Sequence, residues 1–220
     1  MAHLVWDWNG TLFHDIDAVI EATNASFAEL GLPPITLERY RELYCVPVPK
    51  FYERLMGRLP TAEEWAVMDE SFHRYYWRFA AKSGLAEGAA ELLADWQAAG
   101  STQSVCSLAP HGKLVPLLDE HGIAERFVRV DGITGPNGGA KGEHMVRHLT
   151  ALGGALEGLA PERAVVIGDA VDDARAAAQA GAHAVLYTGG SHSRASLARA
   201  GVPVADTLAE AVEIARGLVA

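Results

Sequence analysis

Residues 164–173 read AVVIGDAVDD, an apolar run that ends in a glycine followed by acidic residues. A run without alternating polar residues is typical of a strand that is buried on both faces of a parallel sheet. Residues 3–6 form a second such run and lead into Asp7. Three more runs end in the same manner, at 103–106 before Ser107, 127–130 before Asp131 and 183–187 before Thr188. We therefore expect an α/β fold, with a parallel sheet flanked by helices and polar residues at the carboxyl edge, where such sheets bind ligands.

The segment between the first two strands along the chain has a helical pattern over residues 15–85. Apolar side chains recur at helical spacing from Ile16 to Leu30, and Gly31 ends the pattern. Thr61 and Glu64 have the spacing of a capping box. The helix that follows carries an apolar stripe formed by Trp65, Met68, Phe72, Tyr75 or Tyr76, and Phe79. We interpret this stripe as a surface that packs against other helices of the segment. The prediction is a core domain of residues 1–14 and 86–220, interrupted by an all-helical cap domain of residues 15–85.

Helical patterns also follow the later strands. Each ends at a glycine, and they lie at 111–120 before Gly122, 143–152 before Gly153 and 173–180 before Gly181. A parallel sheet needs crossover connections of this kind, since consecutive parallel strands cannot be joined by a tight turn.

Composition excludes several classes of partner. The formal net charge is −10 at pH 7, whereas nucleic-acid backbones are bound chiefly by clustered lysine and arginine, so we expect no nucleic-acid partner. No apolar run approaches the roughly 20 residues that span a bilayer, and residues 1–6 leave no room for a signal peptide. Cys45 and Cys106 show neither zinc nor disulfide spacing. We expect a cytoplasmic protein with no membrane partner, and the sequence leaves monomer and homodimer open.

Two acidic residues follow buried strands. After Asp7 the chain reads Trp8-Asn9-Gly10-Thr11, where the glycine allows a sharp turn that exposes backbone amides. A carboxylate there can attack phosphorus, bind a metal or cap the turn. Asp169 would face the same edge if the two strands are neighbours, and one or two carboxylates with a substrate phosphate suffice to hold Mg²⁺. Asp172 or Asp173 can also cap the next helix.

Two further residues would complete a phosphate site. Ser107 offers a hydroxyl and nearby backbone amides at the end of its strand. Lys141 follows the glycine-rich stretch 132–139 and offers a positive charge to a phosphoryl group. Each residue alone is more often structural than functional. Together with Asp7 and Asp169 they form, in sequence order, the parts of one phosphoryl-transfer site.

The segments that contain these residues resemble the four motifs of the haloacid dehalogenase superfamily, and they cover residues 5–11, 105–107, 140–141 and 166–173. Their spacing is similar to that of the phosphatases with a helical cap of the C1 type after the first motif, most of all the phosphoglycolate phosphatase branch. The resemblance implies a Rossmann-like core, Mg²⁺ as cofactor and a small phosphorylated metabolite as substrate. It also implies an aspartyl-phosphate intermediate on Asp7.

The same resemblance implies a role for each matching residue. The metal ligands would be Asp7, Asn9 through its backbone carbonyl, Asp169 and Asp173. The catalytic and substrate-binding residues would be Asp7, Asn9, Gly10, Thr11, Ser107 and Lys141. Lys141 would also restrain the charge of Asp7, and Asp173 would orient Lys141 or a metal-bound water. A metal and a lysine can neutralise a phosphoryl group that would otherwise repel an attacking carboxylate.

Asn9 departs from the superfamily pattern. Most of its phosphatases have an aspartate two residues after the nucleophile, which protonates the leaving oxygen and then activates water. An amide cannot exchange a proton at neutral pH, so this contribution, typically about 10²–10⁴ in rate, should be missing. We therefore predict that Asn9→Asp speeds the hydrolysis of aryl phosphates.

Three interpretations of this departure remain open. In the first, the protein is a phosphatase in which water, His14 or a cap residue transfers the proton, and the substrate has a good leaving group. In the second, it cleaves a carbon–phosphorus bond as the phosphonoacetaldehyde hydrolases do, with Lys50 forming a Schiff base. In the third, it is a slow binding or signalling module that accumulates phosphorylated Asp7. The cap residues that could bind a second anionic group of a substrate are Arg39, Arg41, Lys50 and Arg54, although such residues usually face solvent.

Overall fold

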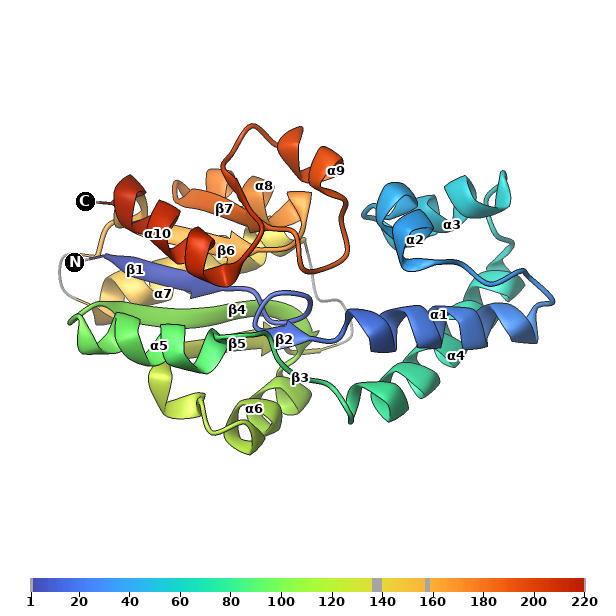
Figure 1. Ribbon diagram of the computed structural model, residues 1–220, viewed down its shortest axis with the longest axis horizontal. Helices are drawn as coiled ribbons and strands as arrows, with labels where there is room; N and C mark the ends of the chain where they lie inside the picture. The colour runs from blue at the N-terminus through green and yellow to red at the C-terminus, as the bar shows by residue number, and fades with distance from the viewer. Residues whose placement is uncertain (1, 136–139, 157–158, 220) are drawn as a thin grey trace.

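The computed structural model describes residues 2–135, 140–156 and 159–219. Residues 136–139 of the predicted glycine-rich stretch lie outside these ranges. Figure 1 shows a sheet with helices around it and, at one end, a separate group of helices joined to the sheet by two chain segments. None of the helices within the described ranges is long and apolar enough to cross a bilayer.

Six strands of the described residues form a parallel sheet in the order β5-β4-β1-β6-β7-β8. Their bounds are β1 His3–Trp6, β4 Thr102–Pro110, β5 Arg129–Ile133, β6 Ala164–Gly168, β7 His183–Tyr187 and β8 Val204–Ala205. The first strand is therefore central, between β4 and β6. The predicted parallel α/β fold is confirmed.

Helices cover both faces of the sheet. Val5 packs with residues of α7 (Lys141–Ala155), α8 (Val171–Ala180) and α9 (Arg194–Ala198). Trp6 packs with residues of α5 (Ala89–Ala98), α6 (His111–Glu120) and α10 (Leu208–Leu218). Successive strand side chains point to opposite faces, so Leu4, Val5 and Trp6 of β1 supply apolar side chains to both faces.

The helical group lies between β2 (Phe13–His14) and β3 (Gly84–Leu85), which pair in antiparallel fashion. It consists of α1 (Ile16–Glu29), α2 (Leu37–Leu43), α3 (Val48–Met56) and α4 (Ala62–Ala80). Its own hydrophobic cluster includes Phe27, Tyr40, Phe51, Tyr52 and Met68. The predicted capping box is confirmed, because Thr61 and Glu64 exchange side-chain and backbone hydrogen bonds. We propose residues 15–85 as the cap domain and residues 1–14 and 86–220 as the core.

Several element boundaries differ from the prediction. The strand predicted at 103–106 is β4, which continues past Cys106 to Pro110. Its register with β5 is irregular between Cys106 and Pro110. The strand expected at 127–130 begins at Arg129, because residues Ala124–Arg126 form a short 3₁₀ helix. Helix α7 is predicted to end at Gly153, but it continues to Ala155. Glycine permits a helix end but does not require one.

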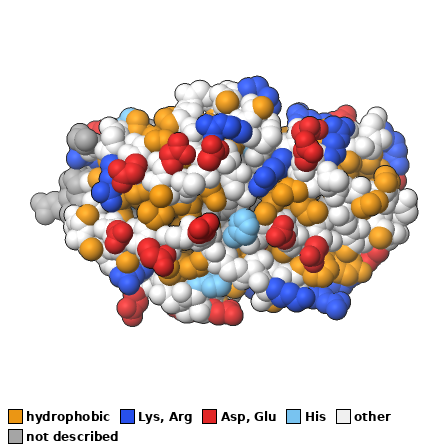
Figure 2. All heavy atoms as spheres, viewed as in Figure 1, with side chains coloured by type: hydrophobic (Ala, Val, Ile, Leu, Met, Phe, Trp, Pro, Cys, Tyr) orange, Lys and Arg blue, Asp and Glu red, His pale blue; other side chains and the backbone are white. Residues whose placement is uncertain are grey.

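The surface in Figure 2 carries both signs of charge. On this face the lysine and arginine side chains form small separate groups, with acidic and hydrophobic side chains between them. A protein that binds a nucleic-acid backbone would place its basic residues together. The face shown offers no such continuous basic surface.

Candidate active site

The strand register brings three of the predicted residues to one edge of the sheet. Trp6 is in register with Val105 of β4 and with Ile167 of β6. The residues that follow these positions, Asp7, Ser107 and Asp169, therefore all lie at the carboxyl edge, where open α/β sheets bind ligands. The backbone N–H of Asp7 donates to the carbonyl oxygen of Ile167 at 2.9 Å, which holds Asp7 beside β6.

Lys141 bridges two of the carboxylates. It is the first residue of α7, and its Nζ lies 2.7 Å from Oδ1 of Asp7 and 2.5 Å from Oδ1 of Asp173. The other oxygen of Asp173 accepts the N–H of Ala170 at 2.9 Å. Asp173 thus caps α8 and holds the lysine at the same time. All three charged side chains are at most 9% exposed.

Asp169 is enclosed by backbone. Its Oδ2 accepts the N–H of Ser191 at 2.6 Å. A Cβ placed on Gly10 would lie 2.7 Å from Oδ2 of Asp169, and one on Gly190 would lie 2.0 Å from it. Gly10 also has a φ of +71°, so both its conformation and the contact exclude a larger residue. The glycine after Asn9 is therefore required by the acidic site itself.

The cluster carries more negative than positive charge. Oxygen atoms of Asp7, Asp169 and Asp173 lie within 4.8 Å of one another, with the single lysine beside them. Burial raises the pKa of Asp7, although Lys141 opposes this, and burial together with the charges of Asp7 and Asp173 raises the pKa of Asp169. Burial would lower the pKa of Lys141, but the two carboxylates outweigh it and raise that pKa. Hard carboxylate oxygens in excess suit a divalent cation such as Mg²⁺.

Asn9 is held by a carboxylate and a phenol that the sequence did not reveal. Its Nδ2 donates to Oδ2 of Asp15 at 2.8 Å and to the hydroxyl of Tyr76 at 2.7 Å. The Tyr76 hydroxyl donates to the same Asp15 oxygen at 2.6 Å, and the N–H of Gly10 donates to the other at 2.8 Å. Burial raises the pKa of Asp15, which is 2% exposed. Both amide hydrogens of Asn9 are committed, so its orientation is fixed.

The catalytic cavity, of about 290 Å³, opens above these groups between the sheet edge and the cap. Its lining includes Asp7, Asn9, Asp15, Tyr76, Ser107 and Lys141. Ser107 is 2% exposed, and its Oγ accepts the N–H of Ala109 at 3.1 Å. The structure therefore brings together the predicted nucleophile, serine and lysine, with Asp169 and Asp173 directly beneath them.

Other predicted residues lie apart from this cavity. Thr11 is fully buried, and its hydroxyl has no hydrogen-bond partner within the described residues. His14 and Lys50 are exposed and do not line the catalytic cavity. Arg41 donates to the carbonyl oxygens of Gly190 at 2.8 Å and Gly189 at 2.9 Å, which ties α2 to the loop after β7. Arg41 thus joins the cap to the core.

The remaining two arginines of the predicted set face solvent. Arg39 pairs with Glu42 at 3.0 Å, with both side chains more than half exposed. Arg54 donates to the carbonyl oxygen of Leu43 at 3.1 Å. Their charges are satisfied on the surface of the cap, as is usual for charged residues on helices.

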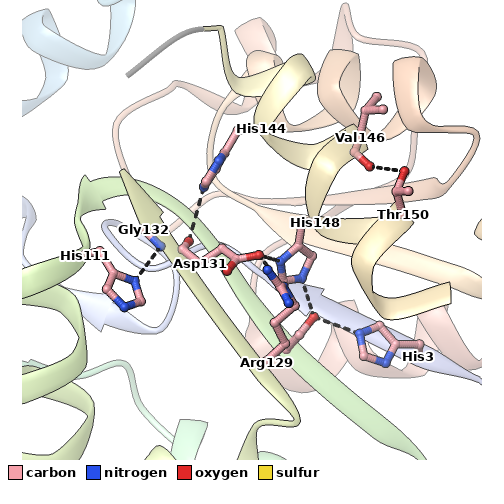
Figure 3. A network of polar contacts seen from close by, with 10 residues as sticks. His3, His111, Arg129, Asp131, Gly132, His144, Val146, His148 and Thr150 are labelled. Carbon is pink, nitrogen blue, oxygen red and sulfur yellow. Dashed lines mark hydrogen bonds and ion pairs between the residues drawn. The ribbon is translucent and has the colours of Figure 1, made fainter. Parts of the chain in front are cut away.

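A second group of polar residues has the composition of a catalytic triad but not its accessibility. Ser104 Oγ lies 2.7 Å from Nε2 of His148, whose Nδ1 lies 2.7 Å from Oδ2 of Asp131 (Figure 3). The same serine oxygen lies 2.8 Å from Nε2 of His3. Ser104, His148 and His3 are 0% exposed, so no substrate can reach the serine. The group joins β1, β4, β5 and α7 and is structural.

This buried group predicts an acid-sensitive fold. Burial lowers the pKa of His3 to about 3, and burial also lowers the pKa of His148. Below a pH of about 6.5 the unfolded chain binds protons that the folded one does not. The free energy of unfolding therefore decreases as the pH is lowered. The loss should be about 2 kcal/mol per fully shifted histidine between pH 6.5 and 5. Urea unfolding at several pH values measures this slope, and His3→Gln should flatten it, whereas the exposed His14→Gln should leave it unchanged.

The fold and the acidic edge define an α/β enzyme core with a helical insertion after its first strand. A family model described as haloacid dehalogenase-like hydrolase matches residues 1–181. The chain therefore belongs to the haloacid dehalogenase-like hydrolases, as the four motifs predicted.

Individual relatives agree with this assignment. A phosphoglycolate phosphatase from Caulobacter vibrioides is 29% identical over 194 residues, covering 86% of this chain and 80% of that protein. A phosphoglycolate phosphatase from Agrobacterium fabrum is 24% identical over 191 residues, covering 84% of this chain and 80% of that protein. Among solved structures, a haloacid dehalogenase-like family hydrolase from Streptococcus pneumoniae has a TM-score of 0.81 at 18% identity, covering 97% of this chain and 98% of that one. Protein Tyrosine Kinase A from Mycobacterium tuberculosis has a TM-score of 0.77 at 22% identity, covering 97% of each chain. These two structural likenesses concern the fold alone.

Proposed function

We propose that this protein is a Mg²⁺-dependent phosphatase that hydrolyses a phosphate monoester of a small metabolite, with Asp7 as nucleophile. The observation that carries the proposal is the buried cluster in which Asp7, Asp169 and Asp173 bring oxygens within 4.8 Å of one another beside Lys141. Uncompensated charge in a buried place is costly, and a divalent cation compensates it. The relatives named phosphoglycolate phosphatase support the same reaction class.

We assign the direct metal ligands to Asp7 and Asp169, with the backbone carbonyl of Asn9. Asp173 has both oxygens engaged, by Lys141 and by the N–H of Ala170, so its proposed role is to hold the lysine. When bound, Mg²⁺ would offset the negative charge that otherwise keeps a phosphoryl group away from a carboxylate.

The chain's own residues would then act in order. Lys141 and Ser107 bind oxygens of the phosphoryl group, and the lysine keeps one Asp7 oxygen oriented. The free oxygen of Asp7 attacks phosphorus while the bond from phosphorus to the leaving oxygen breaks, and the leaving oxygen takes a proton. Water then attacks phosphorus of the phosphorylated Asp7, which releases phosphate and restores the carboxylate. The cap covers the cavity and limits the access of bulk water.

Asn9 has a positioning role in this proposal. Because its two amide hydrogens are donated to Asp15 and Tyr76, it does not supply a proton to the leaving oxygen. Neither His14 nor Lys50 lines the catalytic cavity, so the geometry gives no support to Schiff-base chemistry. Water and the cap residue His73, which lines this cavity, are the proton sources in the proposal.

Removal of the metal tests the proposal. With excess EDTA, phosphate release from phenyl phosphate is expected to fall to background, and added Mg²⁺ should restore it. Mg²⁺ should also raise the unfolding temperature of the wild-type protein, because a ligand stabilises the state that binds it. Asp169→Asn should abolish this rise. Turnover that persists in EDTA would contradict the proposal.

The signalling interpretation predicts different kinetics. A slow module would release one equivalent of phenol in a burst and then almost stop, whereas a phosphatase continues at a steady rate. Rapid-quench measurement of phenol with excess substrate and Mg²⁺ separates the two.

A further inference from the structure

A second cavity adjoins the catalytic one inside the cap. The lining of this aromatic cavity, of about 410 Å³, includes Tyr40, Tyr44, Phe51, Tyr52, Trp65 and Phe72. Four of its lining residues, Tyr40, Tyr44, Phe72 and His73, also line the catalytic cavity. Its volume is within the range of small-molecule sites, which are concave and mostly apolar. The two cavities therefore share one wall, and the aromatic cavity lies next to the catalytic one.

The charges around the two cavities do not suit a substrate with a second anionic group. Of the described residues that line them, Lys141 alone is a lysine or arginine, and it is held by Asp7 and Asp173. The lining also includes Asp15 and Asp69, and His73 lies 3.6 Å from Asp69. A substrate carboxylate would meet rings and carboxylates here, and the desolvation of an unpaired charge is expensive.

The proton requirement of the leaving oxygen points in the same direction. Asn9 lines the catalytic cavity, but its amide hydrogens are donated to Asp15 and Tyr76, and an amide does not give up a proton at neutral pH. An aliphatic alkoxide leaves poorly without a proton, whereas a phenol, with a pKa near 10, leaves as a comparatively stable anion. An aryl ester therefore depends least on a proton donor in the cavity.

We propose that the substrate of this site is a phosphate monoester of a phenol-type aromatic alcohol, with the aromatic rings of the leaving group in the aromatic cavity. The inference rests on the proposed phosphatase function and specifies its substrate class. It sets this chain apart from its relatives named phosphoglycolate phosphatase, whose named substrate is small and carries a carboxylate.

Three esters and one pair of matched variants test the inference. Phenyl and 2-naphthyl phosphate have leaving oxygens of similar acidity and differ by one ring, and 2-phosphoglycolate supplies the anionic alternative. Val48→Trp fills the aromatic cavity from α3. Val67→Trp, at a 40% exposed position on α4 that lines neither cavity, is the control. Thermal unfolding checks that both variants fold.

In the wild-type protein, kcat/KM for 2-naphthyl phosphate should exceed that for phenyl phosphate by about tenfold or more, because the second ring is buried. The kcat/KM for 2-naphthyl phosphate should also exceed the kcat/KM for 2-phosphoglycolate by at least about 100-fold. Val48→Trp should reduce the naphthyl-to-phenyl ratio to near one, and Val67→Trp should preserve it. A preference for 2-phosphoglycolate, or a ratio that Val48→Trp leaves unchanged, would overturn the inference while leaving the phosphatase proposal intact.

A binding measurement separates the two proposals if no ester is hydrolysed, a result that would reject the phosphatase function. Calorimetric titration of 2-naphthol into the wild-type protein should then give tighter binding than phenol, and Val48→Trp should remove the difference. Equal binding of the two phenols would overturn the aromatic site as well.

Discussion

Replacing Asp7 with asparagine is expected to lower kcat for phenyl phosphate by about 10⁴-fold or more, because an amide oxygen is not a nucleophile that can form the covalent intermediate. The same change should make the protein more stable. Asp7 is one of three clustered buried carboxylates, and burial raises its pKa, so its charge is costly to the fold in the absence of the metal. We expect the unfolding temperature in EDTA to rise by about 2–4 °C, the shift that 1 kcal/mol produces in a protein of this size.

Asp172→Asn is the matched control for this variant. Asp172 belongs to the same acidic segment, but it pairs with Arg175 at 3.0 Å and does not line the catalytic cavity. Its replacement should leave kcat within about threefold of the wild-type value. An active Asp7→Asn variant, or an equal loss in both variants, would remove Asp7 from the proposed role.

The double variant Asn9→Asp/Asp15→Asn is expected to hydrolyse alkyl phosphates about 100-fold faster than the wild-type protein, the lower end of the usual contribution of a general acid and base. The two changes exchange the amide at position 9 and the carboxylate at position 15, which are joined by a hydrogen bond in the wild-type protein. The amide introduced at position 15 can donate to the carboxylate introduced at position 9, and the Tyr76 hydroxyl can turn its hydrogen towards that carboxylate. Steady-state rates with ethyl phosphate measure the gain.

The single variants show why both changes are needed. Asn9→Asp alone would place a carboxylate where Nδ2 now lies, 2.8 Å from an Asp15 oxygen. The like charges should lower the unfolding temperature and reduce the gain that the sequence alone predicts. Asp15→Asn alone should bring no gain. A double variant no faster than either single variant would mean that another group already transfers the proton.

The features of the fold and site that sequence could predict depend on local rules. An apolar run that stops at Asp7 or at Asp169 indicates both a buried strand and a polar group at its end, whatever else the chain contains. The order of the four motifs then identified the residues of the cluster. The pairing of β1 with β6, which places Asp7 beside Asp169, is a long-range contact that residue order does not specify.

The residues that sequence missed act through long-range contacts. Tyr76 lies 61 positions after Asp15, and helical spacing offers either it or Tyr75 for an apolar stripe, although the Tyr76 hydroxyl reaches that buried carboxylate. Ser191 contributes only its backbone N–H to Asp169, and a backbone group leaves no signal in residue type. The aromatic cavity depends on how α2, α3 and α4 pack, which helical periodicity does not specify. Lys50 illustrates the converse, since a lysine at a suggestive position can simply face solvent.

In the proposed mechanism Asp7 and Asp169 hold one divalent cation while Asp7 accepts the phosphoryl group. A crystal structure of the wild-type protein with Mg²⁺ and beryllium fluoride, an analogue of the phosphoryl group, would show both roles at once. We predict beryllium fluoride bonded to one oxygen of Asp7, Mg²⁺ in contact with Asp7 and Asp169, and Lys141 and Ser107 bound to the fluorides. Mg²⁺ found away from these two carboxylates, or beryllium fluoride bonded to any other residue, would contradict the proposed mechanism.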